Sequence, residues 1–589
     1  MAKDKMAKAK VSTLKAFWHL FTGFWTSESK WYASGMLALL VALCAAKVYC
    51  VWKIPQWYGQ FDSLIRSNNA NALAKFIPSL QDLALLLGCF ALVDGARGYV
   101  QQQLRLRWRV WMTNRFLTRW MSNRAYYRLQ VMGSDADNPD QRISEDAGFF
   151  AKATLDLLVD FGVSVAIVVA LLAGMLLSAG SQSLTLGTWT FTLGGLFCWG
   201  SLVFYGAGTW LAHLVGRKLI ALKYEQRQRE ADFRFSMMRT RENSESIAFY
   251  GGEKIELEGS CRRFDGVIDN LRRLIDRKTF LRFYTTFFEQ MAVFLPFLMM
   301  LPFVIVSGRI PAACLALLDS CKRIKDSFSC IVNSYETLAE LTAIVRRLDS
   351  LDRSMNEAEA LPGGAALAEG RPGVFETKEL CVQLPSGRTV MANGSLALER
   401  GARMLVTGPS GCGKSTFLRT VSGIWPFGSG EVRKAPEERT LFLPQRPYLP
   451  LGSLRRALCY PLEPLPASED ERLKEVLRKV DLERLIPLLD QEDDWSRILS
   501  LGEQQRVAFA RVLLVRPAWV FLDESTSALD ERRERDMYQL LAAELPAAGV
   551  VSVGHRTTLY ALHDRLMQLT GGSAWSIKAL PCQTQAAPA

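Results

Sequence analysis

The sequence has few of the residues that build metal sites and disulfide frameworks. It contains only four His, and none of its 12 Cys forms a Cys-x-x-Cys pair. A zinc site would need such ligand spacing, and a disulfide scaffold is typical of small secreted chains. Several cysteines, among them Cys44 and Cys198, lie inside apolar runs, where a thiol packs as a small hydrophobic group. The basic N-terminus also lacks the short apolar core and cleavage site of a secretion signal.

The composition predicts a membrane part joined to a soluble part. A chain of 589 residues exceeds one ordinary domain, and a hydrophobic fraction of 49% is too high for a disordered, nucleic-acid-coating protein. Most of the net charge of +12 lies in residues 1–370, whereas residues 371–589 are nearly neutral. The basic residues flank apolar runs instead of forming a polar surface with interleaved aromatics, so no nucleic-acid partner is expected.

Apolar patterning predicts one interfacial helix and several membrane spans. Residues 11–27 carry aromatic side chains at three- and four-residue intervals, which indicates a helix on a membrane surface within an N-terminal segment of residues 1–30. The alternative is a helix packed on a protein core. Stretches near the roughly 20 residues that cross a bilayer follow at 32–52, 80–100, 157–178, 188–213 and 284–306, with a weaker one at 311–334.

The distribution of basic residues supports a sixth span. Residues 101–156 and 216–279 are rich in Lys and Arg, whereas the alternate connections hold very few. The positive-inside rule therefore places the N-terminus, both basic segments and everything after residue 340 in the cytoplasm. Because both termini then lie on one side, the number of crossings is even, and residues 31–349 are expected to form a six-span membrane domain.

Charged residues within the last two spans are candidates for a hydrated pathway. Such side chains are tolerated in a membrane where they face a wet cavity or the protein interior. The candidates are Glu289, Asp319, Lys322, Arg323 and Lys325. Alternatively, the last four lie beyond a short span in a cytoplasmic helical extension, and Glu289 lies near the cytoplasmic edge. Residues 350–372, which contain Pro-Gly-Gly, are predicted to be a linker to a domain at 373–579, followed by a tail at 580–589.

A phosphate-binding loop follows a strand-like run at residues 404–407. The loop reads Gly408-Pro409-Ser410-Gly411-Cys412-Gly413-Lys414-Ser415-Thr416 and leads into a helical pattern. Its glycines let backbone N–H groups approach phosphate oxygens, and the helix N-terminus adds partial positive charge. Lys414 is expected to reach the β- and γ-phosphates of ATP, and the Ser415 hydroxyl to bind Mg²⁺.

Three further strand-like runs end in polar residues suited to phosphoryl transfer. Residues 519–522 end in Asp523 and Glu524, and Gln445 and His555 follow two other apolar runs. Asp523 is predicted to bind Mg²⁺ together with Ser415 and Gln445. Glu524 is predicted to orient or deprotonate the attacking water, with Gln445, His555 and Lys414 near the γ-phosphate.

The ordered set of motifs resembles the nucleotide-binding domain of ABC transporters. After the loop and Gln445 come Leu499-Ser500-Leu501-Gly502-Glu503-Gln504-Gln505-Arg506, Asp523-Glu524, Ser527-Ala528-Leu529-Asp530 and His555. The resemblance implies an all-α six-helix membrane domain of the type IV exporter kind, followed by an α/β P-loop domain. It also implies nucleotide contacts from Ser500, Gly502, Glu503 and Asp530, with the signature segment acting on ATP held by a second subunit. One such domain per chain favours a homodimer.

Other segments resemble subfamily D of the ABC half-transporters and its bacterial relatives. These are Asn138-Pro139-Asp140-Gln141-Arg142-Ile143, the segment from Glu245 through Tyr250 to Gly252, and Trp495. The first two are expected to hold coupling helices, with Asn138, Asp140, Gln141, Glu245 and Tyr250 as candidates. Leu501 and Glu503 replace residues of the usual Leu-Ser-Gly-Gly-Gln signature, as this subgroup does. Leu384 stands where many ABC proteins stack an aromatic ring on adenine.

The resemblance implies an ATP-driven membrane transporter. Within the group, uptake of cobalamin or peptide-like solutes across a bacterial inner membrane is the leading expectation, because the polar sixth span favours a wet cavity. Transport of very-long-chain acyl-CoA is the alternative. An ATP-gated channel is a more remote one, because Glu524, His555 and Ser500 are all present, whereas such channels tend to have a degenerate site.

Overall fold

The computed structural model describes residues 2–66, 72–133, 138–178, 183–186, 189–307, 314–361, 363–571 and 573–580. It divides the chain into two compact units. One comprises Met1–Met121 and Asp135–Ser354, and the other comprises Ser122–Ser134 and Met355–Ala589. A short segment from the first quarter of the sequence therefore folds with the C-terminal unit.

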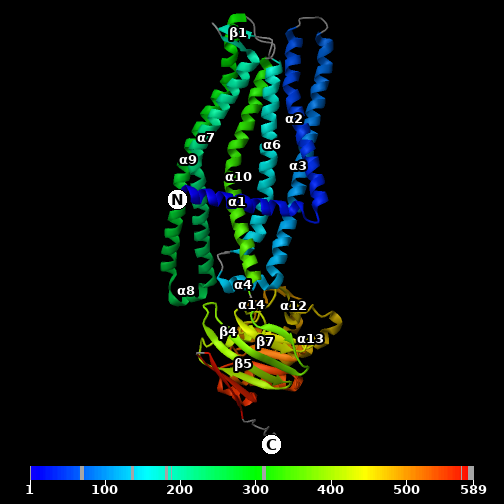
Figure 1. Cartoon of the computed structure of the whole chain (residues 1–589), viewed down its shortest axis with the longest axis vertical. Coiled ribbons are helices and arrows are strands. Elements are labelled where there is room, and N and C mark those ends of the chain that lie inside the picture. Colours follow the sequence, from blue (N-terminus) through cyan, green and yellow to red (C-terminus); the bar gives the residue numbers. More distant parts are fainter. Residues whose placement is uncertain are drawn as a thin grey trace. The chain divides into compact units, whose positions relative to one another are not determined.

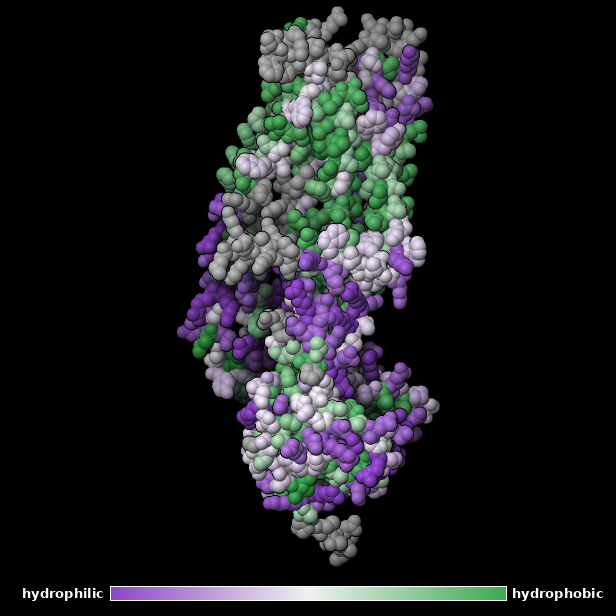
Figure 2. All heavy atoms as spheres, viewed as in Figure 1, coloured by the Kyte–Doolittle hydropathy of each residue, from purple (hydrophilic) through white to green (hydrophobic). Residues whose placement is uncertain are grey.

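Six long helices dominate the first unit (Figure 1). They are α2 (Lys30–Arg66), α3 (Ala72–Met121), α6 (Ala147–Ser178), α7 (Leu193–Glu242), α9 (Glu253–Ser307) and α10 (Cys314–Ala360). Judged by length and composition, α2, α3, α6 and α9 could each cross a membrane. Glycines dilute the hydropathy of α7 and charges that of α10. Figure 2 shows hydrophobic side chains over one part of these helices and hydrophilic ones nearer their other end.

The fourth expected span begins later than the sequence pattern indicated. Residues within 188–213 were expected to be helical, but Trp189–Thr192 form strand β2, which pairs antiparallel with β1 (Ser183–Leu186). The alternation of Thr with Trp and Phe suits a strand better than a helix. The Thr192 hydroxyl then accepts a hydrogen bond from the Gly195 N–H at 3.1 Å, so α7 starts at Leu193 behind an N-cap.

The N-terminal helix α1 (Ala2–Trp25) lies across the bundle of the first unit (Figure 1). Its Phe24 ring is fully buried and stacks on Trp108 of α3, with ring centroids 5.4 Å apart. Leu14 and Trp18 are exposed. One face of the aromatic helix therefore packs on protein, as the alternative reading expected. Another face keeps apolar side chains outward, as a helix on a membrane surface would.

Two sheets form the frame of the second unit. The six-stranded sheet has the order β14 (Ala574–Ala579), β13 (Arg565–Gly571), β6 (Arg403–Thr407), β12 (Gly549–Val553), β11 (Trp519–Asp523) and β8 (Thr440–Leu443). The strands from β13 to β8 are parallel. A four-stranded sheet has the order β3 (Ala366–Glu369), β7 (Gly428–Lys434), β4 (Val374–Gln383) and β5 (Thr389–Glu399). The carboxyl ends of parallel strands share one edge, where open α/β sheets bind ligands.

Helices cover the sheets of this unit and bury their apolar faces. They are α4 (Ala125–Met132), α11 (Lys414–Val421), α12 (Leu454–Cys459), α13 (Asp470–Lys479), α14 (Trp495–Ile498), α15 (Leu501–Val515) and α16 (Glu531–Glu544), with short turns η1 (Ser122–Arg124), η3 (Ala467–Glu469), η4 (Glu483–Leu488) and η5 (Thr557–Leu562) and a small pair of strands β9 (Gly452–Ser453) and β10 (Glu492–Asp493). Leu405, Val520 and Leu522 of the parallel strands lie in one buried cluster with Val507 and Phe509 of α15.

The predicted linker at 350–372 is mostly regular structure, so that prediction was wrong. Helix α10 continues to Ala360, with Leu351, Met355 and Ala358 fully buried at helical spacing. Strand β3 begins at Ala366 and pairs in parallel with β7. Apolar periodicity therefore extends the helix until the Pro-Gly-Gly segment ends it. Residues 581–589 of the predicted tail lie outside the described residues.

Candidate functional site

The phosphate-binding loop has the backbone that its glycines require. Gly408, Gly411 and Gly413 have φ values of +152°, +77° and +100°. A Cβ on Gly413 would lie 2.0 Å from Cγ1 of Val390, and one on Gly408 would lie 2.3 Å from the Leu569 carbonyl oxygen. Only glycine fits both positions. The loop connects β6 to the N-terminus of α11, where free N–H groups and the helix dipole favour an anion.

Lys414 closes over this loop. Its Nζ donates to the carbonyl oxygens of Gly408 at 2.9 Å and Pro409 at 3.1 Å, and its side chain is buried. Ser410 is exposed beside these carbonyls, and Cys412 and Thr416 are buried behind the loop. The ammonium is thus held where phosphate oxygens would replace the two carbonyl acceptors.

The predicted Mg²⁺ ligands Ser415 and Asp523 meet at the edge of the sheet. The Ser415 hydroxyl donates to Oδ1 of Asp523 at 3.0 Å. Burial raises the pKa of Asp523, the neighbouring Glu524 carboxylate raises it further, and the hydrogen bond from Ser415 opposes both effects. A hydroxyl and a half-buried carboxylate at this distance fit a hard cation that prefers oxygen ligands, which would relieve the cost of burying the charge.

Glu524 is held between the two other polar residues that follow strands. Its Oε2 accepts from Nε2 of Gln445 at 3.2 Å, and its Oε1 lies 3.4 Å from Nε2 of His555. Its backbone has φ +47°, an uncommon conformation for a residue other than glycine. The ends of β8, β11 and β12 therefore bring Gln445, Glu524 and His555 together, as expected.

The signature residues form a separate group at the start of α15. The Ser500 hydroxyl accepts from the Glu503 N–H, and Glu503 Oε2 accepts from the Ser500 N–H at 3.0 Å, which is a capping box. A Cβ on Gly502 would lie 3.2 Å from the Ala528 carbonyl oxygen. Asp530 caps α16 by accepting from the Arg533 N–H at 2.8 Å.

Within the described parts of the chain, no hydrogen bond or ion pair joins these four residues to the phosphate-binding loop. Glu503 pairs instead with Arg484. This separation fits a signature segment that serves another subunit.

One connecting residue was missed by the sequence reasoning. Gln505 is fully buried, and its Nε2 donates to the Gln445 carbonyl oxygen at 3.1 Å and to the Ser527 hydroxyl at 3.3 Å. Its Oε1 accepts from the Ala528 N–H at 3.1 Å. Gln505 therefore ties the loop after β8 to the loop after β11. The sequence feature that could have identified Gln505 is a carboxamide on an otherwise apolar face of its helix.

A buried carboxylate supports the same loops. Glu534 accepts from Thr526 at 2.6 Å and Thr558 at 2.9 Å, and Arg556 donates to the carbonyl oxygen of Leu529 at 2.7 Å. Arg556, the residue after His555, is thus connected to the loop that ends at Asp530.

Leu384 stands where many ABC proteins have an adenine-stacking aromatic, and it packs half-buried against the core.

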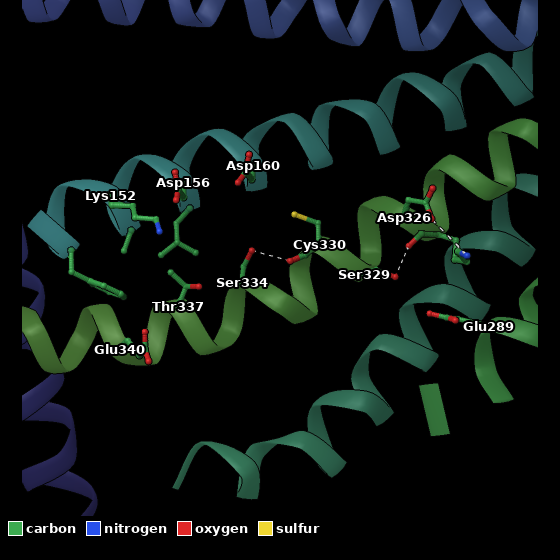
Figure 3. Close-up of a pocket in the computed structure, with 14 residues that line it drawn as sticks. Lys152, Asp156, Asp160, Glu289, Asp326, Ser329, Cys330, Ser334, Thr337 and Glu340 are labelled. Carbon is green, nitrogen blue, oxygen red and sulfur yellow. Dashed lines mark hydrogen bonds and ion pairs between the residues drawn. The ribbon is translucent and has the colours of Figure 1, made fainter. Parts of the chain in front are cut away.

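The first unit contains a polar cavity of about 650 Å³ between α6, α9 and α10. Glu289 and Lys325 line it, whereas Asp319, Lys322 and Arg323 are not among its lining residues. Asp319 and Arg323 pair with each other along α10 at 2.6 Å. Figure 3 shows further polar side chains around the cavity that the sequence reasoning did not select, namely Lys152, Asp156, Asp160, Asp326, Ser329, Ser334, Thr337 and Glu340.

Cations behind this cavity balance its carboxylates. Asp156 pairs with Arg105 and accepts from Gln101 at 3.0 Å, and Asp160 lies 3.6 Å from Arg97. Arg97 and Lys47 share Asp94 at 3.1 and 2.7 Å, and Glu340 pairs with Arg227. The ion pairs connect α2, α3 and α6, all of which the sequence predicted as apolar spans.

The predicted coupling residues all lie in the first unit. Asn138 precedes α5 (Pro139–Gln141), which contains Asp140, and Gln141 donates to Glu145 at 3.1 Å in the following turn η2 (Arg142–Asp146). Glu245 and Tyr250 belong to α8 (Ser244–Tyr250), which has no buried residue.

In contrast to the predicted coupling residues, helix α4 and the turn η1 before it belong to the same unit as the nucleotide site. Arg124 donates to the Gly423 carbonyl oxygen and Arg128 to the Ala358 carbonyl oxygen, both at 3.1 Å. Tyr127, whose pKa burial raises, lies near Arg419 of α11. The sequence reasoning did not single out α4.

Comparison with known proteins agrees with this geometry. Residues 23–305 match the family "ABC transporter transmembrane region 2", and residues 391–527 match the family "ABC transporter". An uncharacterized ABC transporter ATP-binding protein of Haemophilus influenzae is 32% identical over 96% of this chain and 93% of its own. The Escherichia coli inner membrane ABC transporter ATP-binding protein YddA is 30% identical, over 90% and 94%.

More distant relatives extend the match to the whole fold. The human lysosomal cobalamin transporter ABCD4 is 28% identical, over 93% of both chains. A bacterial Atm1-family ABC exporter solved with ATP bound has a TM-score of 0.67 at 17% identity, covering 92% of this chain and 94% of its own, which confirms the expected exporter-type fold. The chain belongs to the ABC transporters, as an ATP-hydrolysing half-transporter of subfamily D and its bacterial relatives.

Proposed function

We propose that two copies of this chain form a homodimer that takes up cobalamin or peptide-like hydrophilic solutes across a bacterial inner membrane. The observation that carries the proposal is the polar cavity between α6, α9 and α10. Eleven of its 14 lining residues are charged or carry hydroxyl or thiol groups. Such side chains are kept in a membrane domain where they face water or a polar ligand.

The charge balance of this cavity also favours a hydrophilic cargo of low net charge. Asp156, Asp160 and Glu340 each have an arginine partner, and Asp326 lies 3.7 Å from Lys325. An acyl-CoA would need an apolar channel for its chain and unpaired cations for its phosphates. Only three of the 14 lining residues, Phe149, Ala153 and Leu157, are apolar, so the cavity offers no such apolar channel. The human lysosomal relative is a cobalamin transporter and the Escherichia coli relative is an inner membrane protein, which supports the same proposal.

The geometry of the second unit supports a cycle of ATP binding and hydrolysis by the pair. Lys414 is placed to bind phosphate oxygens, and Glu524 to take a proton from water, with Gln445 and His555 orienting it. Mg²⁺ held by Ser415 and Asp523, with Gln445 nearby, would neutralise charge on the phosphates. Ser500, Gly502, Glu503 and Asp530 of the second copy would complete each site. The helical segments at 122–133, 138–146 and 244–250 would transmit closure to the membrane unit.

Uptake into proteoliposomes tests this function. The purified chain is reconstituted into vesicles loaded with ATP, and labelled cyanocobalamin, a proline-rich peptide or palmitoyl-CoA is added outside in separate reactions. We expect ATP-dependent accumulation of cyanocobalamin or the peptide and none of palmitoyl-CoA. The matched Glu524→Gln protein is expected to accumulate nothing. Accumulation of palmitoyl-CoA alone would assign the chain to lipid transport, and solute flow only down a gradient would indicate a channel.

A further inference from the structure

A second recess of about 460 Å³ lies further along the bundle, between α2, α6 and α10. Leu171, Gly174 and Met175 of α6 and Ala316, Leu317 and Ser320 of α10 form two of its walls. The first cavity uses residues 149–160 of α6 and 325–340 of α10. The recess and the cavity therefore lie along the same pair of helices, with centres about 28 Å apart by the rise of α6.

The third wall is a polar stripe on α2. Trp52, Gln56, Gln60 and Ser63 follow one another at intervals of four, four and three residues, so they share one face of the helix. Pro55 and Gly59 lie beside them in the same wall. Gln56 is half-buried and Gln60 is exposed, so each carboxamide is open to a polar counterpart in the recess.

That counterpart is missing from the protein itself. The Ser63 and Ser320 hydroxyls donate to carbonyl oxygens of their own helices, at 2.6 and 2.8 Å. Across the residues that the structure describes, the side-chain amides of Gln56 and Gln60 have no hydrogen-bond partner. Each carboxamide has two N–H donors and an oxygen acceptor available toward the recess.

The chemistry of the recess selects one class of group. It has no charged lining residue, unlike the cavity further along α6. An anionic or cationic ligand would find no counter-charge there, and a wholly apolar one would leave the two carboxamides unpaired. A neutral amide both donates and accepts, so it matches a glutamine side chain in two hydrogen bonds. The Trp52 ring adds a flat apolar surface, and Nε1 of this ring would lie 3.2 Å from a Cβ on Gly174.

We propose that this recess is a second cargo site, which binds carboxamide or peptide groups of the transported solute through Gln56 and Gln60. The inference rests on the proposed function and deepens it, because it names the chemical group by which the cargo is recognised. Peptide backbones and the amide side chains of a corrinoid share that group. The charged cavity then accommodates the remaining polar parts of the solute during its passage.

A double variant, Gln56→Leu with Gln60→Leu, tests the site in the reconstituted full chain. Leucine keeps the side-chain size and removes the amide. We expect the apparent KM for cyanocobalamin or proline-rich peptide uptake to rise at least fivefold. The matched control is Gln81→Leu, an exposed glutamine of α3 outside the recess, which we expect to leave KM unchanged. The conservative Gln56→Asn is expected to retain part of the affinity.

Cysteine protection gives a second measurement if the double variant folds poorly. Modification of Gln60→Cys by a maleimide, followed by mass spectrometry, is expected to slow severalfold when cyanocobalamin or the peptide is present. The rate at which Gln81→Cys is modified is expected to stay the same when the solute is present. Wild-type uptake of an amide-bearing solute with unchanged KM in the double variant and no protection at Gln60→Cys would overturn the inference. If the wild type takes up neither solute, the proposed function itself fails.

Discussion

Glu524 is the single residue on which we expect ATP turnover to depend most. Its carboxylate contacts Gln445 on one side and His555 on the other. Its backbone has a positive φ value, and it lies at the same edge of the sheet as the phosphate-binding loop. Backbone strain of this kind concentrates at functional sites.

Asp523, whose pKa is raised by burial, is protonated at a higher pH than an ordinary aspartate. Mg²⁺ binding is therefore expected to weaken at a higher pH than it would at an aspartate with an ordinary pKa.

Substituting Glu524 by glutamine is expected to lower ATP turnover by about a hundredfold or more, because a carboxamide cannot accept the proton from water. ATP binding, measured with a fluorescent nucleotide, is expected to persist. Glu531→Gln, on an exposed residue of α16, is the control for loss of a carboxylate. Unaltered turnover in the Glu524 variant would remove this residue from the role of base.

His563 makes the nucleotide-binding unit sensitive to acid. Its ring bonds to the Leu559 carbonyl oxygen at 2.7 Å and the Ser552 hydroxyl at 2.9 Å, and burial lowers its pKa to about 4. The unfolded chain takes up a proton near pH 6.5, whereas the folded unit resists protonation until about pH 4. Stability is therefore complete above about pH 6.5 and is lost as the pH falls toward 4, by roughly 2 kcal/mol at pH 5.

Thermal unfolding of the detergent-solubilised chain between pH 7 and pH 5 measures this loss. The variant His563→Gln cannot titrate, so its unfolding temperature is expected to vary less with pH over that range, even if it is lower throughout. If the unfolding temperature falls equally in both proteins between pH 7 and pH 5, groups other than His563 control the acid sensitivity.

Sequence patterns indicated which residues follow the strands of the sheet but not which residues support them. Gln445, Asp523, Glu524 and His555 each follow an apolar strand, and parallel strands bring such ends to one edge. Gln505 makes its contacts with loops 22 and 60 residues away in the sequence. No local pattern specifies such distances, because they depend on how α15 packs on the sheet.

At the scale of elements, helix boundaries differ most from expectation. The long helices were recognisable from apolar runs, but α10 continues through the region expected to be a linker, and β2 takes residues expected to be helical. In both places tertiary packing decides: buried leucines extend α10, and pairing with β1 extends the strand. The ion pair of Lys47 with Asp94 was unpredictable, since the two residues come from separate helices, α2 and α3.

Helix α4 is expected to be the element through which ATP hydrolysis responds to cargo. Arg124 donates to the carbonyl oxygen of Gly423, just after the helix that begins with Lys414 and Ser415. Removing the guanidinium in Arg124→Ala is expected to lower cargo-stimulated ATP turnover severalfold while leaving the basal rate within about twofold. The exposed Gln130 of α4, the helix that follows Arg124, provides the control variant Gln130→Ala. Equal stimulation of ATP turnover by cargo in both variants would show that this contact plays no part in coupling.

At the scale of the whole molecule, the separation of signature and loop residues predicts composite sites. Lys414→Ala disables the loop of one copy, and Ser500→Ala disables its signature. A mixture of the two proteins forms mixed dimers in which one site is intact and the other doubly damaged. Since half the dimers are mixed, up to roughly a quarter of wild-type ATP turnover is expected, against almost none for either protein alone. A chain that stays monomeric at saturating ATP would contradict the scheme.

The assignment of residues 122–133 to the C-terminal unit has a consequence for synthesis. This segment leaves the ribosome roughly 220 residues before the rest of its unit begins, and at typical elongation rates it waits roughly ten to fifty seconds for its partner surface. During that interval its apolar side chains Ala125 and Leu129 have nothing of their own unit to cover them. Nascent chains of this protein are therefore expected to need chaperone protection early, and a gene fragment encoding only residues 355–589 is expected to yield an ATPase lacking one of its own structural parts.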